Sequence, residues 1–289
     1  MISERLADQR VAILGLGLMG GSLAMALRGR CAELLGIDPD PLARALAEQR
    51  GLVERLSADP AKLLPEATLV VLAAPVRAII GLINDLPHLH PAGAIVLDLG
   101  STKAEIAMAM QSLPRRFEPV GGHPMCGKVE SSAVYAQADL YQEAPFVLCE
   151  LPNSSLRACR LAQALVEAIG ARPVWLEPER HDQWVAHTSH LPYLLANALA
   201  FTTPPQAAAL VGPGFRSAAR LAPASQRMML DILITNQPNI LASLRACRLH
   251  LEILEEALTA GDYAHLQNLL GQGAYAFEAL TGARDDDER

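Results

Sequence analysis

Short apolar runs alternate with amphipathic stretches through the first 176 residues of the chain. Apolar runs bounded by turn residues are typical of buried strands, and apolar residues that recur every three or four positions are typical of helices. The expected strands are Val11–Leu14, Glu33–Ile37, Thr68–Ala73, Ala94–Asp98, Phe117–Val120, Pro145–Cys149 and Arg172–Leu176. The expected helices are Ser22–Arg28, Leu42–Arg50, Val76–Leu86, Thr102–Gln111 and Ser154–Ile169. This alternation predicts an α/β fold with a Rossmann-type, doubly wound and mainly parallel sheet.

Residues 177–282 show no convincing strand pattern. The expected helices there are Glu179 to about Phe201, Met228–Ile234, Ile240–Ala260 and Tyr263–Leu280. Pro192 lies inside the first of them and is expected to kink it. We therefore predict an α/β domain over residues 1–176, an all-helical domain over 177–282 and a disordered acidic tail over 283–289.

The last three expected helices carry wide apolar stripes. One stripe comprises Leu241, Leu244, Leu251, Leu254 and Leu258. A helical domain of this size exposes much of such a surface unless a second copy covers it. The stripes therefore predict a homodimer.

Composition narrows the class of protein. Hydrophobic residues make up 51% of the 289 residues and the net charge is −7, which argues against nucleic acid as a partner. The five cysteines are scattered without a CxxC pair, as expected for reduced thiols. The polar stretch Met1–Arg10 does not resemble a signal peptide, and no apolar run approaches the roughly 20 residues of a membrane span. We expect a cytoplasmic protein without a membrane segment.

A glycine-rich loop, Gly15–Gly20, lies between the first expected strand and helix. This GxGxxG spacing allows a tight turn, close approach of a pyrophosphate and close packing of the helix on the strand. Asp38 follows the second strand, 18 residues after Gly20. A carboxylate there binds the ribose hydroxyls and repels a 2′-phosphate, which predicts NAD rather than NADP; the alternative is an ordinary turn aspartate. The candidate cofactor-binding residues are Gly15, Gly17, Leu18, Met19, Gly20, Asp38, Ala74 and Pro75.

The segment Gly121–Gly127 places His123 between a double glycine and a proline, just past an expected strand. Ligands of doubly wound sheets bind beyond the carboxyl ends of the strands. We interpret the segment as a stiff turn that presents an imidazole for proton exchange, the alternative being an incidental histidine. Ser101 follows another strand at the same edge, where it acts on a ligand or only caps a helix. Lys103 is expected to be a solvated lysine.

The helical half offers fewer candidates. His187 and His190 are three residues apart, but no third metal ligand accompanies them, so we predict no metal. His190 is either a core histidine or a substrate contact. Arg216 and Arg220 follow a Gly-Pro-Gly loop and form either an anion clamp or a solvated helix face.

Taken in order, these motifs resemble the prephenate/arogenate dehydrogenase family of tyrosine biosynthesis along nearly the whole chain. The matching segments are Gly15–Gly20, Asp98–Lys103, Gly121–Gly127, Thr188–Pro192 and Gly214–Arg220. The resemblance implies a nucleotide-binding domain followed by a helical dimerisation domain, with the active site between them. It also implies NAD as the cofactor, prephenate or arogenate as the small-molecule substrate, and no metal.

The resemblance further implies a role for each matched residue. His123 is expected to take the proton of the ring C4 hydroxyl as hydride leaves for NAD⁺, and Ser101 to hydrogen-bond that hydroxyl and the histidine. His190 is expected to line the substrate pocket and Arg220 to bind a substrate carboxylate. The chain departs from the family at Ser217, where Asp is common, and at Met229-Leu230, where a Trp-Arg pair is common.

Two other classes remain open. A β-hydroxyacid dehydrogenase shares the glycine loop but would carry a catalytic lysine on the helix that follows the sheet, and no lysine occurs after Lys128. A regulatory protein that senses NAD without turnover would need no base at residue 123.

Overall fold

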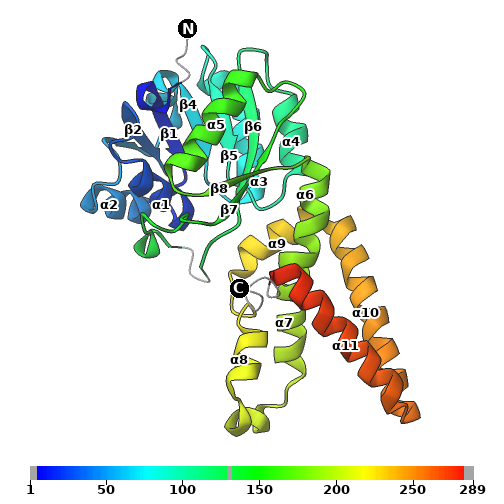
Figure 1. Cartoon of the computed structure of the whole chain (residues 1–289). Coiled ribbons are helices and arrows are strands. Elements are labelled where there is room, and N and C mark those ends of the chain that lie inside the picture. The colour runs from blue at the N-terminus through cyan, green and yellow to red at the C-terminus, as the bar shows by residue number, and fades with distance from the viewer. Residues whose placement is uncertain (1–4, 129–131, 283–289) are drawn as a thin grey trace, which may run out of the picture. The chain divides into compact units, whose positions relative to one another are not determined.

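The computed structural model describes residues 5–128 and 132–282, which fall into two compact units divided between Asn239 and Ile240. The first unit is built on one sheet (Figure 1). Its strands are β1 (Arg10–Leu14), β2 (Glu33–Ile37), β3 (Arg55–Ser57), β4 (Leu69–Leu72), β5 (Ile95–Asp98), β6 (Glu118–Pro124), β7 (Pro145–Cys149) and β8 (Arg172–Trp175). The strand order is β3-β2-β1-β4-β5-β6-β7-β8. Each neighbouring pair is parallel except β6 and β7, which are antiparallel.

This topology confirms the doubly wound, mainly parallel sheet. The apolar runs predicted seven of the strands. Six of these are largely buried, whereas β8, at one edge of the sheet, has mostly exposed side chains. The sequence pattern did not predict β3, an edge strand whose three residues are all partly exposed. A short edge strand needs no continuous apolar run, so it leaves no such signal.

Helices cover both faces of the sheet, and alternate residues of each strand face opposite sides. In β1, Val11 and Ile13 pack in one apolar core while Ala12 and Leu14 pack in the other. The helices α1 (Leu18–Leu27), α2 (Pro41–Gln49) and α5 (Leu156–Ala168) contribute to the first core. The second core contains side chains of α3 (Val76–Leu89) and α4 (Ala104–Gln111).

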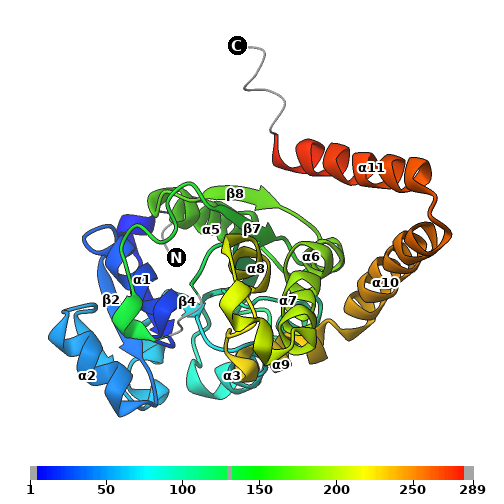
Figure 2. The ribbon, with the colours of Figure 1, turned by 90° about the horizontal axis from the view of Figure 1, so that it is seen from below.

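Helices alone follow β8 in the described part of the chain. They are α6 (Pro178–Val185), the π-helical segment η5 (Ala186–His190), α7 (Leu191–Thr202), the 3-10 segment η6 (Pro205–Leu210), α8 (Pro213–Ala219) and α9 (Gln226–Thr235). Figure 1 and Figure 2 both show α7 beside α8. The expected helix from Glu179 to Phe201 is present, but its irregular turn is the π-helical segment, which ends before Pro192. Trp184, on α6, is exposed.

The second unit consists of most of α10 (Gln237–Ala260) together with α11 (Tyr263–Thr281). Few of its side chains are buried, and many large apolar side chains are exposed. No helix within residues 5–128 and 132–282 is long and apolar enough to cross a membrane. The acidic tail predicted over 283–289 lies outside the described residues.

Candidate active site

The glycine loop joins β1 to α1 at the carboxyl edge of the sheet. Gly15 has φ = +99°, and a Cβ atom there would lie 2.3 Å from the Ala73 carbonyl oxygen, so only glycine fits. Gly17 caps α1 without a side-chain hydrogen bond, and Leu18 begins the helix. The first N–H groups of α1 thus have no capping side chain, and such groups bind phosphate. The loop therefore fits a dinucleotide, and its contact with Ala73 brings it next to Ala74 and Pro75.

Asp38 directly follows β2, and both of its carboxylate oxygens accept backbone hydrogen bonds. Oδ2 accepts the Leu16 N–H at 2.7 Å, and Oδ1 accepts the Asp40 N–H at 2.8 Å. The first hydrogen bond links Asp38 to the glycine loop. The second forms an Asx turn, as expected if Asp38 were an ordinary turn aspartate. Each oxygen keeps a further lone pair, so the carboxylate can also accept a ribose hydroxyl.

His123 lies on β6 and not on the turn that the sequence indicated. Beyond Val120, β6 leaves its pairing with β5 and continues against β7, where His123 pairs with Val147. The glycines gave no strand periodicity, and the pairing that makes this segment a strand comes from a distant part of the chain. His123 thereby projects past the end of β5 at the carboxyl edge, on a backbone fixed by a neighbouring strand.

The ring of His123 is hydrogen-bonded to a second histidine, from α6. His123 Nδ1 lies 2.8 Å from His181 Nε2, and His181 Nδ1 lies 2.8 Å from Asp182 Oδ1. His181 and Asp182 are each 1% exposed, whereas His123 is only partly buried. The three side chains form a line from a buried carboxylate to a more accessible imidazole.

Asp182 also joins α6 to α4. Its Oδ1 accepts the Lys103 N–H at 2.7 Å and its Oδ2 accepts the Ala104 N–H at 2.9 Å. These N–H groups belong to the start of α4, where the helix dipole favours a negative charge. The backbone carbonyl of Asp182 in turn accepts a hydrogen bond from Asn236 Nδ2 at 2.7 Å. The carboxylate is therefore held from several sides.

Lys103 is buried, which corrects the expectation of a solvated lysine. It is 1% exposed and forms an ion pair with Asp98, which is fully buried at the end of β5. Lys103 Nζ also donates to the Gly122 carbonyl at 2.7 Å, and Asp98 Oδ1 accepts the Gly122 N–H at 3.0 Å. A Cβ atom at Gly122 would lie 2.4 Å from the Asp98 carbonyl oxygen. The pair thus clamps the backbone next to His123 at a point where only glycine fits.

The site favours neutral imidazoles. Burial lowers the pKa of His123 well below its ordinary value, and the nearby His181, Lys103 and His190 lower this pKa further. Burial also lowers the pKa of His181, although the hydrogen bond to Asp182 opposes this shift. Burial lowers the pKa of His190 to about 4. At neutral pH these rings are therefore able to accept protons.

The other predicted site residues, Ser101, His190 and Arg220, are not part of the hydrogen-bonded line from Asp182 to His123. Ser101 is half-buried at the carboxyl edge, but no hydrogen bond joins it to His123 among the described residues. His190 is 1% exposed, and its Nδ1 lies 3.2 Å from Asn236 Nδ2. Arg220, at the end of α8, is exposed. The π-helical segment leaves His187 exposed and His190 buried, so these two do not act as a pair.

His181, Asp182, Asn236 and the buried Lys103–Asp98 pair were not found from the sequence. A signal existed for the first two, since the polar pair lies three to four residues before Val185 on the apolar side of an amphipathic helix. Nothing local marked Lys103 as buried, because its partner and its burial depend on how β5, β6 and α4 meet.

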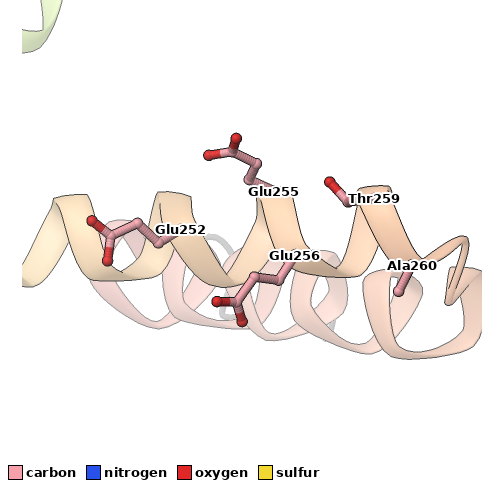
Figure 3. A pocket seen from close by; sticks show the side chains of 5 residues that line it. All are labelled: Glu252, Glu255, Glu256, Thr259 and Ala260. Carbon is pink, nitrogen blue, oxygen red and sulfur yellow. The ribbon is translucent and has the colours of Figure 1, made fainter.

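A shallow depression on α10 is a poor alternative site. It is lined by Glu252, Glu255, Glu256, Thr259 and Ala260 (Figure 3). All of these residues come from one helix, and the carboxylates of Glu255 and Glu256 point to opposite sides of it. An anionic ligand would be repelled there.

Two family models match the chain. The model described as "Prephenate dehydrogenase, nucleotide-binding domain" matches residues 23–175, and "Prephenate dehydrogenase, dimerization domain" matches residues 177–272. The chain is 30% identical over 241 residues to the prephenate dehydrogenase of Bacillus subtilis. The matched region covers 80% of this chain and 65% of the Bacillus protein. This chain thus spans slightly less than two thirds of that relative.

Solved structures agree with these matches. The crystal structure of prephenate dehydrogenase from Aquifex aeolicus, in complex with hydroxyphenyl propionate and NAD⁺, is similar with a TM-score of 0.87 and 27% identity, over 95% of this chain and 99% of that one. The crystal structure of Synechocystis arogenate dehydrogenase is similar with a TM-score of 0.80 and 29% identity, over 94% of this chain and all of that one (100%).

Proposed function

The chain belongs to the prephenate dehydrogenase family, and we propose that it catalyses the NAD-dependent oxidative decarboxylation of prephenate to 4-hydroxyphenylpyruvate in tyrosine biosynthesis. The corresponding conversion of arogenate to tyrosine uses the same chemistry at the ring. One observation carries the proposal: His123 lies at the carboxyl edge that holds the glycine loop, one of its ring nitrogens is hydrogen-bonded to His181, and no described residue is hydrogen-bonded to the other.

In this proposal His123 is the base. Its Nε2 takes the proton of the ring C4 hydroxyl while the C4 hydride departs and a C4 carbonyl forms. Bound NAD⁺ supplies the hydride acceptor. The resulting dienone loses carbon dioxide, and the electron pair of the broken bond makes the ring aromatic as the ring oxygen regains a proton. The chain therefore needs to supply one base and to position the ring.

The cofactor-binding residues follow from the fit of the loop. Gly15, Gly17 and the start of α1 at Leu18, Met19 and Gly20 would hold the pyrophosphate, and Asp38 would hold the ribose. Ala74 and Pro75, between β4 and α3, would line the same edge. The carboxylate at residue 38 favours NAD over NADP because it repels a 2′-phosphate.

The substrate contacts are Ser101, His190 and Arg220. Ser101 would hydrogen-bond the C4 hydroxyl, His190 would line the pocket, and the guanidinium of Arg220 would bind a carboxylate. The exposure of Arg220 leaves its donors available. Residues 177–282 would thus form the substrate and dimerisation domain.

We propose that the active protein is a homodimer. Many large apolar side chains of α10 and α11 are exposed, including Leu251, Leu258, Leu270, Phe277 and Leu280. Apolar helix faces of this extent are commonly covered by a second copy. The dimerisation-domain model that matches residues 177–272 supports this assignment.

A direct assay tests the function. The purified protein is incubated with NAD⁺ and either prephenate or arogenate, and NADH is followed by its absorbance at about 340 nm. We expect NADH from at least one substrate, and the product analysis then identifies it. Formation of NADH from neither substrate would exclude the proposal, and turnover of a β-hydroxyacid instead would favour the rival class.

A further inference from the structure

We propose that Asp182, acting through His181, holds His123 in the tautomer whose lone pair is on Nε2, and thereby makes His123 a base. This inference rests on the proposed function, because it assigns positioning roles for the same reaction. Asp182 and His181 are each 1% exposed. They act through the hydrogen bonds that join α6 to β6.

Asp182 sets the direction of these hydrogen bonds. Its carboxylate accepts the backbone N–H groups of Lys103 and Ala104, and its Oδ1 also lies 2.8 Å from His181 Nδ1. The two backbone groups are donors whatever the pH, and they lie at the start of α4, where a negative charge is stabilised. A protonated carboxyl would place its hydrogen against a donor or against the ring. Asp182 is therefore an acceptor only.

The state of His181 follows from that of Asp182. Because the carboxylate only accepts, His181 Nδ1 must carry the hydrogen that is donated to Oδ1 over 2.8 Å. The ring is 1% exposed, and its burial disfavours a second proton. In the neutral ring Nε2 therefore bears a lone pair, and it is this atom that faces His123.

The state of His123 follows in the same way. His181 Nε2 accepts over 2.8 Å, so His123 Nδ1 must be the donor. A neutral ring with hydrogen on Nδ1 has its lone pair on Nε2, to which no described residue is hydrogen-bonded and which can accept from a hydroxyl. In the opposite tautomer, two lone pairs would face each other between the rings, and Nε2 would carry hydrogen and could not act as a base.

The surrounding charges have opposite effects on protonated His123. Burial disfavours the imidazolium most, and the nearby His181, Lys103 and His190 disfavour it further. Once Nε2 takes a proton, the negative charge of Asp182 stabilises the imidazolium through His181. Asp98 does not contribute in the same way, because it is already paired with Lys103. The arrangement supplies a base that is neutral at rest and whose protonated form is stabilised by one hydrogen-bonded line.

The tautomer can be measured on the unmodified protein. In ¹⁵N-histidine-labelled protein, two-bond ¹H–¹⁵N correlations distinguish rings with hydrogen on Nδ1 from rings with hydrogen on Nε2. The signal of residue 123 is assigned by its loss in His123→Asn. We expect hydrogen on Nδ1 for both His123 and His181 at pH 7. Hydrogen on Nε2 of His123 would overturn the proposal. This result does not depend on whether variants of His181 or Asp182 fold.

Kinetics of Asp182→Asn test the consequence. The amide presents an N–H₂ group, so it can donate to His181 Nδ1, reverse both rings and block Nε2 of His123. We expect kcat to fall about 10²-fold or more, with the KM for NAD⁺ within about threefold, by analogy with other carboxylate-oriented histidines. The ¹⁵N spectrum should then show hydrogen on Nε2 of His123. An unchanged tautomer and kcat would contradict the proposal.

His181→Gln separates orientation from charge. The glutamine oxygen can accept from His123 Nδ1 but forms no cation, so the tautomer should be kept while the acid limb of kcat/KM against pH moves. His187→Asn, at an exposed histidine of the π-helical segment η5 that follows α6, is the matched control and should change neither the tautomer nor the pH profile. If His123→Asn is fully active, the proposed function fails. If His123→Asn is inactive but Asp182→Asn and His181→Gln keep the wild-type activity, only the positioning role fails.

Discussion

At the scale of single residues, the proposed chemistry rests on His123, and His181 and His190 lie near enough to lower its pKa. Each has a pKa lowered chiefly by burial, so each is neutral at pH 7. A general base must be unprotonated before it reacts, and a neutral ring meets this requirement without a nearby carboxylate in direct contact with it. Asp182 instead acts one ring away.

The lowered pKa of His190 makes stability depend on pH. Above its ordinary value of 6.5 the ring is neutral in both the folded and unfolded chain. As pH falls below 6.5 the unfolded chain binds a proton first, so the free energy of unfolding declines until the folded ring titrates at about 4. We expect His190 to account for about 3 kcal/mol of this decline.

Urea unfolding of the wild type and of His190→Gln at several pH values between 7 and 4 measures this contribution. The variant should lose less stability over that interval, because residue 190 no longer titrates. His88→Asn, which changes an exposed histidine, is the control and should follow the wild type. Equal pH dependence in wild type and His190→Gln would contradict the assignment.

Asp38 should determine the choice between NAD⁺ and NADP⁺. Replacement by serine removes the charge that repels a 2′-phosphate, so Asp38→Ser should raise kcat/KM for NADP⁺ relative to NAD⁺ by about tenfold or more. The variant also loses the bond to the Leu16 N–H, so its thermal stability should fall. Asp40→Ser, two residues away, retains a capping side chain and should leave the ratio unchanged. An unaltered ratio in Asp38→Ser would reject the role.

At the scale of elements, the site depends on how β5, β6, α4 and α6 meet. The Lys103–Asp98 pair holds both the N–H and the carbonyl of Gly122, next to His123. Removing one partner of a buried ion pair leaves the other charge without compensation. We expect Lys103→Met to lower the free energy of unfolding by about 3–5 kcal/mol.

Denaturant unfolding of Lys103→Met, compared with Lys62→Met at an exposed lysine, measures this loss. The double variant Lys103→Met/Asp98→Asn should regain part of the stability, since the orphaned charge is gone. A loss no larger than that of Lys62→Met would show that the pair does not hold the strands.

The sequence predicted the elements well where burial alone defines them. The strand Pro145–Cys149 was placed at its observed bounds because its apolar run is buried. The continuation of β6 through His123 was not predicted, since glycine and proline carry no periodicity and the pairing partner β7 lies some 20 residues on. His123 and the glycine loop could be proposed from local motifs, whereas Lys103, His181 and Asp182 needed contacts between distant elements.

At the scale of the whole molecule, the helices α10 and α11 should bind a second copy. Sedimentation velocity should give twice the mass of the chain, and the double variant Leu258→Glu/Leu270→Glu should shift the protein toward monomer, because charges at an apolar interface stay unpaired. Leu42→Glu, at an exposed leucine of α2, is the control and should remain dimeric. A monomeric wild type at micromolar concentration would contradict the dimer.

The most direct test of the central claim is the turnover of His123→Asn with NAD⁺ and saturating substrate, measured beside the wild type and His88→Asn. If His123 is the base, kcat falls about 10²-fold or more while NAD⁺ affinity, measured by titration calorimetry, and thermal stability stay close to those of the wild type. If His123 is only structural, the variant is less stable but keeps its activity per folded molecule. That second result would contradict the account.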